Sequence, residues 1–303
     1  MPNNFNDIPG SEDWLSVEPI QKGWSNDAKY RIQTGNHGSF LLRISGISEF
    51  DRKKEEYEAV KRLDGRSLFM SRPVDFGVCN DGKSVYMLLT WLEGIDAEEV
   101  LPALKDEVQY ALGYQAGKAL REMHRLSAPS AREDWARYFN RKTDRKIENY
   151  LDCPVKFEKS HKIIEYIHDN RRLLEGRPQT FQHGDFHAGN MIVNAQNEIG
   201  IIDFNRYDYG DPWEEFNRIV FCAGISSQFA SGRINGYFEG KVPEVFFRLM
   251  ALYIGSNTLS SIPWAIPFGE AEVSFMLNQV RNVLDWYDDF HTFIPKWYIP
   301  NLS

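Results

Sequence analysis

Residues 181–205, which read FQHGDFHAGNMIVNAQNEIGIIDFN, constrain the fold of this chain more than any other stretch. Two short apolar runs, 191–193 and 199–202, are separated by the polar segment 194–198, whose Asn residues carry turn chemistry. The second run is rich in β-branched residues, which favours a strand. The pattern predicts a β-hairpin that follows a polar, glycine-bearing loop at 186–190.

The two ends of this predicted hairpin carry oxygen ligands. Asn190 begins the first strand and Asp203 ends the second. Antiparallel pairing brings these ends together, because paired strands lie about 4.8 Å apart. An amide oxygen and a carboxylate then face one small volume. Such ligands suit Mg²⁺, which takes one or two groups from the protein and completes its shell with phosphate and water.

A further carboxylate, Asp185, precedes Asn190 on the loop. The run His183-Gly184-Asp185-(x4)-Asn190 matches the kinase catalytic loop H-R-D-x-x-x-x-N, with Gly184 in place of Arg. In that loop the carboxylate orients an attacking hydroxyl and accepts its proton, while amide and carboxylate ligands hold the metal on the triphosphate. A lone H-G-D is a weak signal, but here the spacing, the hairpin and the downstream Asp coincide.

HGDFHAGN followed by IIDFN resembles the aminoglycoside phosphotransferase family, whose members are antibiotic kinases with the two-lobed protein-kinase fold. Small-molecule kinases for choline, homoserine, fructosamines and macrolides are similar. The resemblance implies that Asp185 is the catalytic base and that Asn190 and Asp203 bind Mg²⁺. It implies a transferase that moves the γ-phosphate of ATP or GTP to a hydroxyl of a small polar molecule, which is cationic in the aminoglycoside class.

Three other functions stay open. A metabolite kinase of the choline, amino-alcohol, homoserine or macrolide class would share every motif above. A non-catalytic nucleotide-binding pseudokinase is favoured by one feature, an arginine (Arg43) where the family has a lysine. A protein kinase is disfavoured, because no A-P-E segment follows Asp203.

The expected fold is α+β and bilobal, like a protein kinase. A small lobe with an antiparallel sheet is predicted for residues 1–92 and binds the nucleotide. A large, mostly helical lobe is predicted for residues 93–303 and carries catalysis and the acceptor site. Strands are predicted at 39–44, 72–78 and 85–92, and helices at 48–63, around 108–123, at 243–262 and at 270–290.

The nucleotide is expected to lie against the small lobe. Residues 20–31 predict a hairpin, and in the family a serine-containing turn at this place covers the phosphates; Ser25 and Asn26 are the candidates here. Arg43 occupies the position of the lysine that reaches the α/β-phosphates. A guanidinium forks onto phosphate bidentately, so Arg43 can serve there.

A charged helix and the link between the lobes complete the expected nucleotide site. Ser48 and Asp51 predict a capping box for the helix at 48–63. The resemblance implies that Glu56, with Glu55 as the near alternative, would hold Arg43. The resemblance places an adenine against the Thr90 carbonyl and the Leu92 N–H.

The acceptor is expected to meet the segment after the hairpin. Asp208, Glu214 and Glu215 are candidates for binding it, although a helix start at Asp211-Pro212 gives these acids a structural explanation as well. His124 closes an apolar helical stripe and is interpreted as a packed structural histidine.

The composition excludes some classes of protein. The chain has 35 Lys and Arg against 43 Asp and Glu, a net charge of −8, which argues against nucleic acid as a partner. The N-terminus MPNNFNDIPG lacks the features of a signal peptide, no apolar run has the length of a membrane span, and the three cysteines form no C-x-x-C. A cytoplasmic location is expected.

Overall fold

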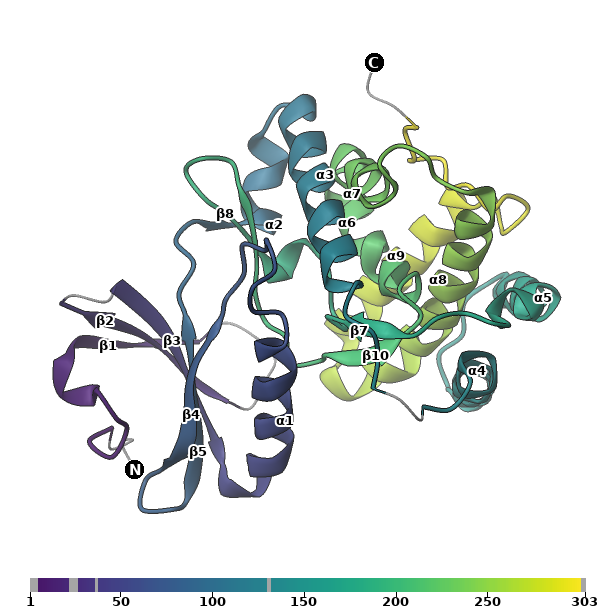
Figure 1. The fold of residues 1–303 in the computed structure, drawn as a ribbon. Coiled ribbons are helices and arrows are strands. Elements are labelled where there is room, and N and C mark those ends of the chain that lie inside the picture. The colour runs from purple at the N-terminus through teal and green to yellow at the C-terminus, as the bar shows by residue number, and fades with distance from the viewer. Residues whose placement is uncertain (1–4, 22–26, 36–37, 130–131, 301–303) are drawn as a thin grey trace.

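The computed structural model describes residues 5–21, 27–35, 38–129 and 132–300. The N-terminal part is an antiparallel sheet with strand order β1-β2-β3-β5-β4, and the C-terminal part is mostly helical (Figure 1). The sheet is formed by β1 (Trp14–Ile20), β2 (Ala28–Thr34), β3 (Gly38–Gly46), β4 (Pro73–Cys79) and β5 (Ser84–Thr90). Helix α1 (Phe50–Lys61) connects β3 to β4 and packs on β4 and β5. The predicted hairpin at 20–31 is present, since β1 pairs with β2.

The alternation of side chains along β3 fixes the direction of the candidate site residue Arg43. Leu42 and Ile44 belong to the cluster on the face away from α1. Leu41 packs with Tyr57 of α1 on the other face. Arg43 alternates with Leu42 and Ile44, so its side chain enters the buried space between the sheet and α1.

The start of α1 differs from the prediction. A 3-10 turn, Ile47–Glu49, comes first, and Glu49 at the N-cap makes no side-chain capping hydrogen bond. The capping box of Ser48 and Asp51 is therefore wrong. The 3-10 turn moves Ser48 out of the N-cap position, so its hydroxyl does not meet the first free N–H groups of the helix.

The C-terminal part contains a three-stranded sheet of order β6-β8-β9, a small β10-β7 ribbon and the longer helices. The strands are β6 (Ile95–Asp96), β7 (Thr180–Gln182), β8 (Met191–Val193), β9 (Ile199–Ile201) and β10 (Asp208–Gly210). The helices are α2 (Ala97–Val100), α3 (Asp106–Met123), α4 (Trp135–Asp152), α5 (Ser160–Asn170), α6 (Ile219–Ile225), α7 (Ser227–Phe238), α8 (Glu244–Ala265) and α9 (Glu270–Trp286). The lobe boundary after Leu92 stays a prediction.

Helices α3 and α7 cross with their backbones in close approach. A Cβ on Gly113 or Gly117 of α3 would lie 2.1 Å from a carbonyl oxygen of α7, and Gly232 and Gly236 of α7 meet α3 at 2.2 and 2.1 Å. Glycine at these positions is required because only a hydrogen atom fits between the helices. The crossing carries the buried Arg233 of α7 toward the site described below.

Two further expectations need correction. Helix α8 does not end at 262 as predicted but continues through Pro263 to Ala265, and every residue of 249–256 is buried over more than two turns. The helix predicted to start at Asp211-Pro212 begins as a 3-10 segment, Glu214–Arg218. Asp211 still accepts the Trp213 N–H at 3.0 Å, as a capping carboxylate does. Within the described part of the chain, no helix is suited by length and hydropathy to span a bilayer.

Candidate active site

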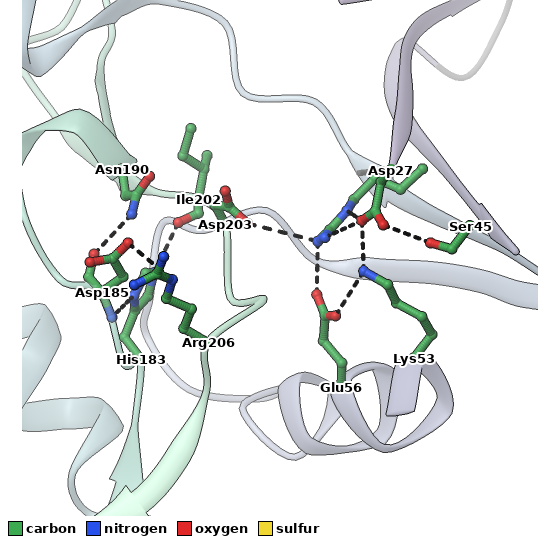
Figure 2. A network of polar contacts seen from close by, with 11 residues as sticks. Asp27, Ser45, Lys53, Glu56, His183, Asp185, Asn190, Ile202, Asp203 and Arg206 are labelled. Atoms are coloured by element: carbon green, nitrogen blue, oxygen red, sulfur yellow. Dashed lines mark hydrogen bonds and ion pairs between the residues drawn. The ribbon is translucent and has the colours of Figure 1, made fainter. Parts of the chain in front are cut away.

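The predicted hairpin is present and its ends meet. Strand β8 pairs antiparallel with β9, Met191 opposite Ile201. The Ile202 N–H donates to the Asn190 carbonyl at 3.1 Å, which extends the ladder to the residue before Asp203. Figure 2 shows the side chains of Asn190, Asp203 and Asp185 in one region of the structure. The hairpin thus juxtaposes the residues that the sequence placed at its ends.

Hydrogen bonds fix the loop that carries Asp185. Asn190 Nδ2 donates to the Asp185 carbonyl at 2.9 Å. His183 is fully buried, and its Nε2 lies 2.9 Å from the Ile202 carbonyl, so Nε2 bears the proton. Its Nδ1 then accepts the Asp185 N–H at 3.3 Å. Burial lowers the pKa of His183, which keeps the ring neutral and this tautomer in place.

The buried carboxylate of Glu215 holds this loop through hydrogen bonds to its backbone. The Glu215 oxygens accept the N–H groups of His183 at 2.6 Å and Gly184 at 2.9 Å. Burial alone would raise the pKa of Glu215, but the adjacent His124 ring and the Arg233 guanidinium lower it. Glu215 is 2% exposed, so its carboxylate supports the loop and does not face an acceptor.

Two other buried residues, Arg233 and His124, lie next to Glu215. Only His124 was identified from the sequence. Arg233 donates to the Phe186 carbonyl at 2.7 Å and the Glu215 carbonyl at 3.1 Å. His124 is buried as expected, with Nδ1 2.9 Å from Tyr237 Oη. Arg233 lies within the run SGRING on α7, and its residue type alone does not distinguish it from a surface arginine. The glycines of that run, which allow the α3–α7 crossing, were the available signal.

The glycine of the H-G-D motif is required by the fold. Gly184 has φ +83°, and a Cβ there would lie 1.8 Å from the Arg206 carbonyl oxygen. We expect Gly184→Ala to destabilise the protein by at least roughly 1–3 kcal/mol, because it combines a left-handed backbone with a collision against backbone. Urea unfolding measures this loss.

Gly240→Ala is the matched control for that variant. Gly240 also has a positive φ, +75°, but a Cβ there meets nothing within 4 Å. The control therefore carries the cost of the left-handed conformation alone, about 1–2 kcal/mol. Equal losses in the two variants would refute the steric explanation.

Two guanidinium groups and an imidazole surround Asp185. Its carboxylate lies 3.3 Å from Arg218 Nε, 3.6 Å from His187 Nε2 and 3.8 Å from Arg206 Nε. Burial alone would raise the pKa of Asp185, but His187, Arg218 and Arg206 hold it well below its usual range. The group is therefore ionised and is a weak base, suited to orienting a hydroxyl.

Asn190 and Asp203 fit the ligand set of a magnesium ion. The hydrogen bond from Asn190 Nδ2 to the Asp185 carbonyl orients the amide and leaves its oxygen as the ligand atom. Asp203 has φ 62°, a strained conformation for a residue with a Cβ and one found at functional sites. The described ranges contain no cluster of three or more His, Cys, Asp or Glu suited to a metal. A Mg²⁺ completed by phosphate and water requires no such cluster.

Arg43 belongs to a closed, buried network of charges. Its Nη1 donates to Glu56 Oε1 at 2.8 Å, and its Nη2 donates to Asp27 Oδ2 at 2.5 Å (Figure 2). Lys53 Nζ contacts the same Asp27 oxygen at 2.6 Å and Glu56 at 3.4 Å. Ser45 donates to Asp27 Oδ1 at 2.8 Å. Of the two alternatives for the partner of Arg43, the structure therefore selects Glu56, while Glu55 is exposed.

Sequence reasoning missed Lys53 and Asp27. Every residue of 52–56 is charged, which is typical of a solvated helix face, yet Lys53 is 2% exposed. The available signal was its spacing, since Lys53 lies three residues before Glu56 and four before Tyr57, on one helix face. Arg43 also lies 3.8 Å from Asp203, which links this network to the candidate metal site.

The remaining expected nucleotide contacts are partly described. Thr90 ends β5, and its carbonyl accepts the Ser71 hydroxyl at 2.7 Å. Leu92 follows β5 and is half-buried. Contacts of Thr90 and Leu92 with adenine stay predictions. Ser25 and Asn26 lie outside the described residues.

Asp208 and Glu214 each have a cationic neighbour. Asp208 accepts from Arg132 at 3.1 Å. Glu214 accepts from Gln182 at 3.2 Å and lies 3.7 Å from Lys142 Nζ. The three acids proposed for the acceptor are thus engaged within the protein, and Asp208 and Glu214 retain exposure to solvent.

The sheet is joined to helix α1 by buried ion pairs, and a loop and hairpin carry Asp185, Asn190 and Asp203. These features define the class of the kinase-like phosphotransferases. Residues 16–247 match the phosphotransferase enzyme family, and the chain belongs to it. Aminoglycoside 3'-phosphotransferase from Niallia circulans is 24% identical over 215 residues, which is 68% of this chain and 77% of that protein.

Solved structures with the same fold support this assignment. The GDP complex of wild-type aminoglycoside 2'-phosphotransferase-IIIa superposes with a TM-score of 0.67 at 17% identity, over 92% of this chain and 94% of that one. A ternary complex of aminoglycoside phosphotransferase APH(4)-Ia with ADP and hygromycin B gives 0.65 at 12% identity, over 89% and 94%. The predicted bilobal kinase-like fold is confirmed.

Proposed function

We propose that this protein transfers the γ-phosphate of ATP or GTP to a hydroxyl of a small polar molecule in the cytosol, with Mg²⁺. The observation that carries the proposal is the juxtaposition of Asn190 and Asp203 at one end of the β8–β9 hairpin, with Asp185 on the same loop. Nucleotide-bound relatives of the same fold support it.

Each group has a distinct task in this proposal. Asn190 and Asp203 would hold Mg²⁺, which supplies charge neutralisation on the triphosphate. Asp185 orients the acceptor hydroxyl and receives its proton as the oxygen attacks phosphorus. Catalysis then consists of positioning and charge stabilisation, with little covalent work for the protein.

The acceptor class stays open at this level. The relatives make an aminoglycoside the first candidate, and a choline, amino-alcohol, homoserine or macrolide acceptor is the alternative. A coupled assay of nucleoside diphosphate release with Mg·ATP and Mg·GTP, run across these acceptors, tests the proposal. A protein that binds nucleotide but neither turns it over with any of these acceptors nor hydrolyses it slowly would be a pseudokinase instead.

Asp203→Asn tests the metal assignment separately. Because the variant removes a charged ligand but keeps the shape of the side chain, we expect Mg·ATP to bind at least about 10-fold more weakly. Calorimetric titration with Mg²⁺, repeated in EDTA, measures this. Wild type and variant should bind the metal-free nucleotide alike. An unchanged affinity with Mg²⁺ would remove Asp203 from the metal site.

A further inference from the structure

Cations from several elements gather on the acceptor side of Asp185. Arg218 ends the 3-10 segment after β10, and Arg206 follows the hairpin. Both guanidinium groups lie within 4 Å of the Asp185 carboxylate. An acceptor whose hydroxyl meets Asp185 therefore approaches through a positively charged surrounding.

Helix α4 adds two lysines to this surrounding. Lys142 and Lys146 lie one turn apart on the same helix face. Lys142 Nζ is 3.7 Å from Glu214 Oε1. Lys146 is half-buried, and among the residues that the structure describes it has no carboxylate within ion-pair distance. Burial, with the charges of Lys142 and Arg218, lowers the pKa of Lys146 to about 7.

The neighbouring acids do not balance these cations. Asp208 is paired with Arg132, and Glu215 is buried beneath the catalytic loop. Glu214 contacts α4 through Lys142, and it also accepts a hydrogen bond from Gln182. Lys146 therefore has no counter-ion among the described residues, and a bound anion would supply one.

We infer that the acceptor carries an anionic group, a carboxylate or a phosphate, which binds at Lys146 and Lys142 while its hydroxyl meets Asp185. This inference rests on the proposed phosphotransfer function and narrows the open acceptor class. It departs from the polycationic aminoglycosides, whose ammonium groups would meet Arg218, Arg206 and the two lysines at short range. The anion takes the place of the missing counter-ion of Lys146.

A charge series on one sugar scaffold tests the inference. Gluconate and glucose 6-phosphate carry an anion, glucose is neutral and glucosamine is cationic; kanamycin adds the aminoglycoside. Calorimetry with wild type at neutral pH should show at least one of the two anions binding at least roughly 10-fold tighter than glucose. Gluconate and glucose 6-phosphate separate carboxylate from phosphate as the preferred group.

Lys146→Gln should abolish this preference, because it keeps the length of the side chain and removes the charge. Arg145→Gln is the matched control. Arg145 directly precedes Lys146 on α4 and is exposed, so removal of its charge should leave the preference for anions unchanged. Anions that bind no better than glucose, tighter binding of kanamycin or glucosamine, or a preference that survives in Lys146→Gln would each overturn the inference.

Nucleotide turnover distinguishes a failure of the proposed phosphotransfer function from a failure of the proposed anion site. Slow Mg·ATP hydrolysis by the wild type without acceptor reports on the phosphotransfer machinery and does not depend on acceptor binding. If the wild type hydrolyses nucleotide but does not prefer anions, the anion site alone would be refuted. Anion binding without any nucleotide turnover would refute the proposed function alone.

Discussion

Asp185→Asn is expected to lower kcat by about 10²–10⁴-fold while leaving the affinity for Mg·nucleotide nearly unchanged. The amide keeps the size of the side chain but cannot accept the proton of the acceptor hydroxyl. A coupled assay at saturating acceptor measures kcat, and calorimetry measures nucleotide binding. Thermal unfolding shows whether the loop remains intact.

The groups around Asp185 lead to a second prediction, which concerns the pH dependence of kcat/KM. The pKa of Asp185 is lowered in the folded state by His187, Arg218 and Arg206, against the effect of burial. The group therefore stays ionised as pH falls toward 4, and it should cause no acidic limb in kcat/KM above about pH 4. A turnover that is insensitive to Asp185→Asn would remove the residue from catalysis.

Arg43→Ala is expected to cause the largest loss of stability, roughly 3–5 kcal/mol. The variant leaves Asp27 and Glu56 buried with Lys53 as their one remaining cationic partner in the network. Urea unfolding measures the loss. Arg43→Lys should lose less, because it keeps the charge and gives up the fork that reaches both carboxylates.

Arg52→Ala is the control on the exposed side of the same helix. Arg52 pairs with Glu49 at 2.6 Å, but both side chains are well exposed, so the change should cost no more than about 1 kcal/mol. A loss for Arg43→Ala as small as this would show that the network contributes little to stability.

The same network gives the pH dependence of stability a definite sign. Burial would raise the pKa of Asp27, but Arg43 and Lys53 lower it well below its usual range. A carboxyl whose folded pKa is depressed stabilises the protein fully above its unfolded pKa of about 3.9, and this contribution is lost as pH falls through the folded pKa. Arg43→Ala should therefore weaken the dependence of unfolding on pH below about 4.

The network also changes how Arg43 is understood. Arg43 and Lys53 are balanced by Asp27 and Glu56, and all four side chains are buried. The guanidinium of Arg43 binds two carboxylates, and a second cation, Lys53, comes from α1. Contact of Arg43 with phosphate stays a prediction.

Local patterns determined much of the fold and of the candidate site. The hairpin at 191–201 followed from two apolar runs and a turn, and its register brought Asn190 and Asp203 to one end. The hairpin depends on neighbours in the sequence, so the sequence states it directly. The pairing of Arg43 with Glu56 or Glu55 was instead implied by the resemblance to the family.

Only the tertiary structure decided which charged residues are buried and which charges meet. Lys53, Arg233 and Lys146 look like surface cations in their own segments, yet each lies in an environment formed by distant parts of the chain. The physical reason is that the cost of burying a charge depends on the partners that folding supplies, and those partners come from other elements. The sequence by itself determined the hairpin and the residues at its ends, and the packing of α1, α4 and α7 determined the charge around them.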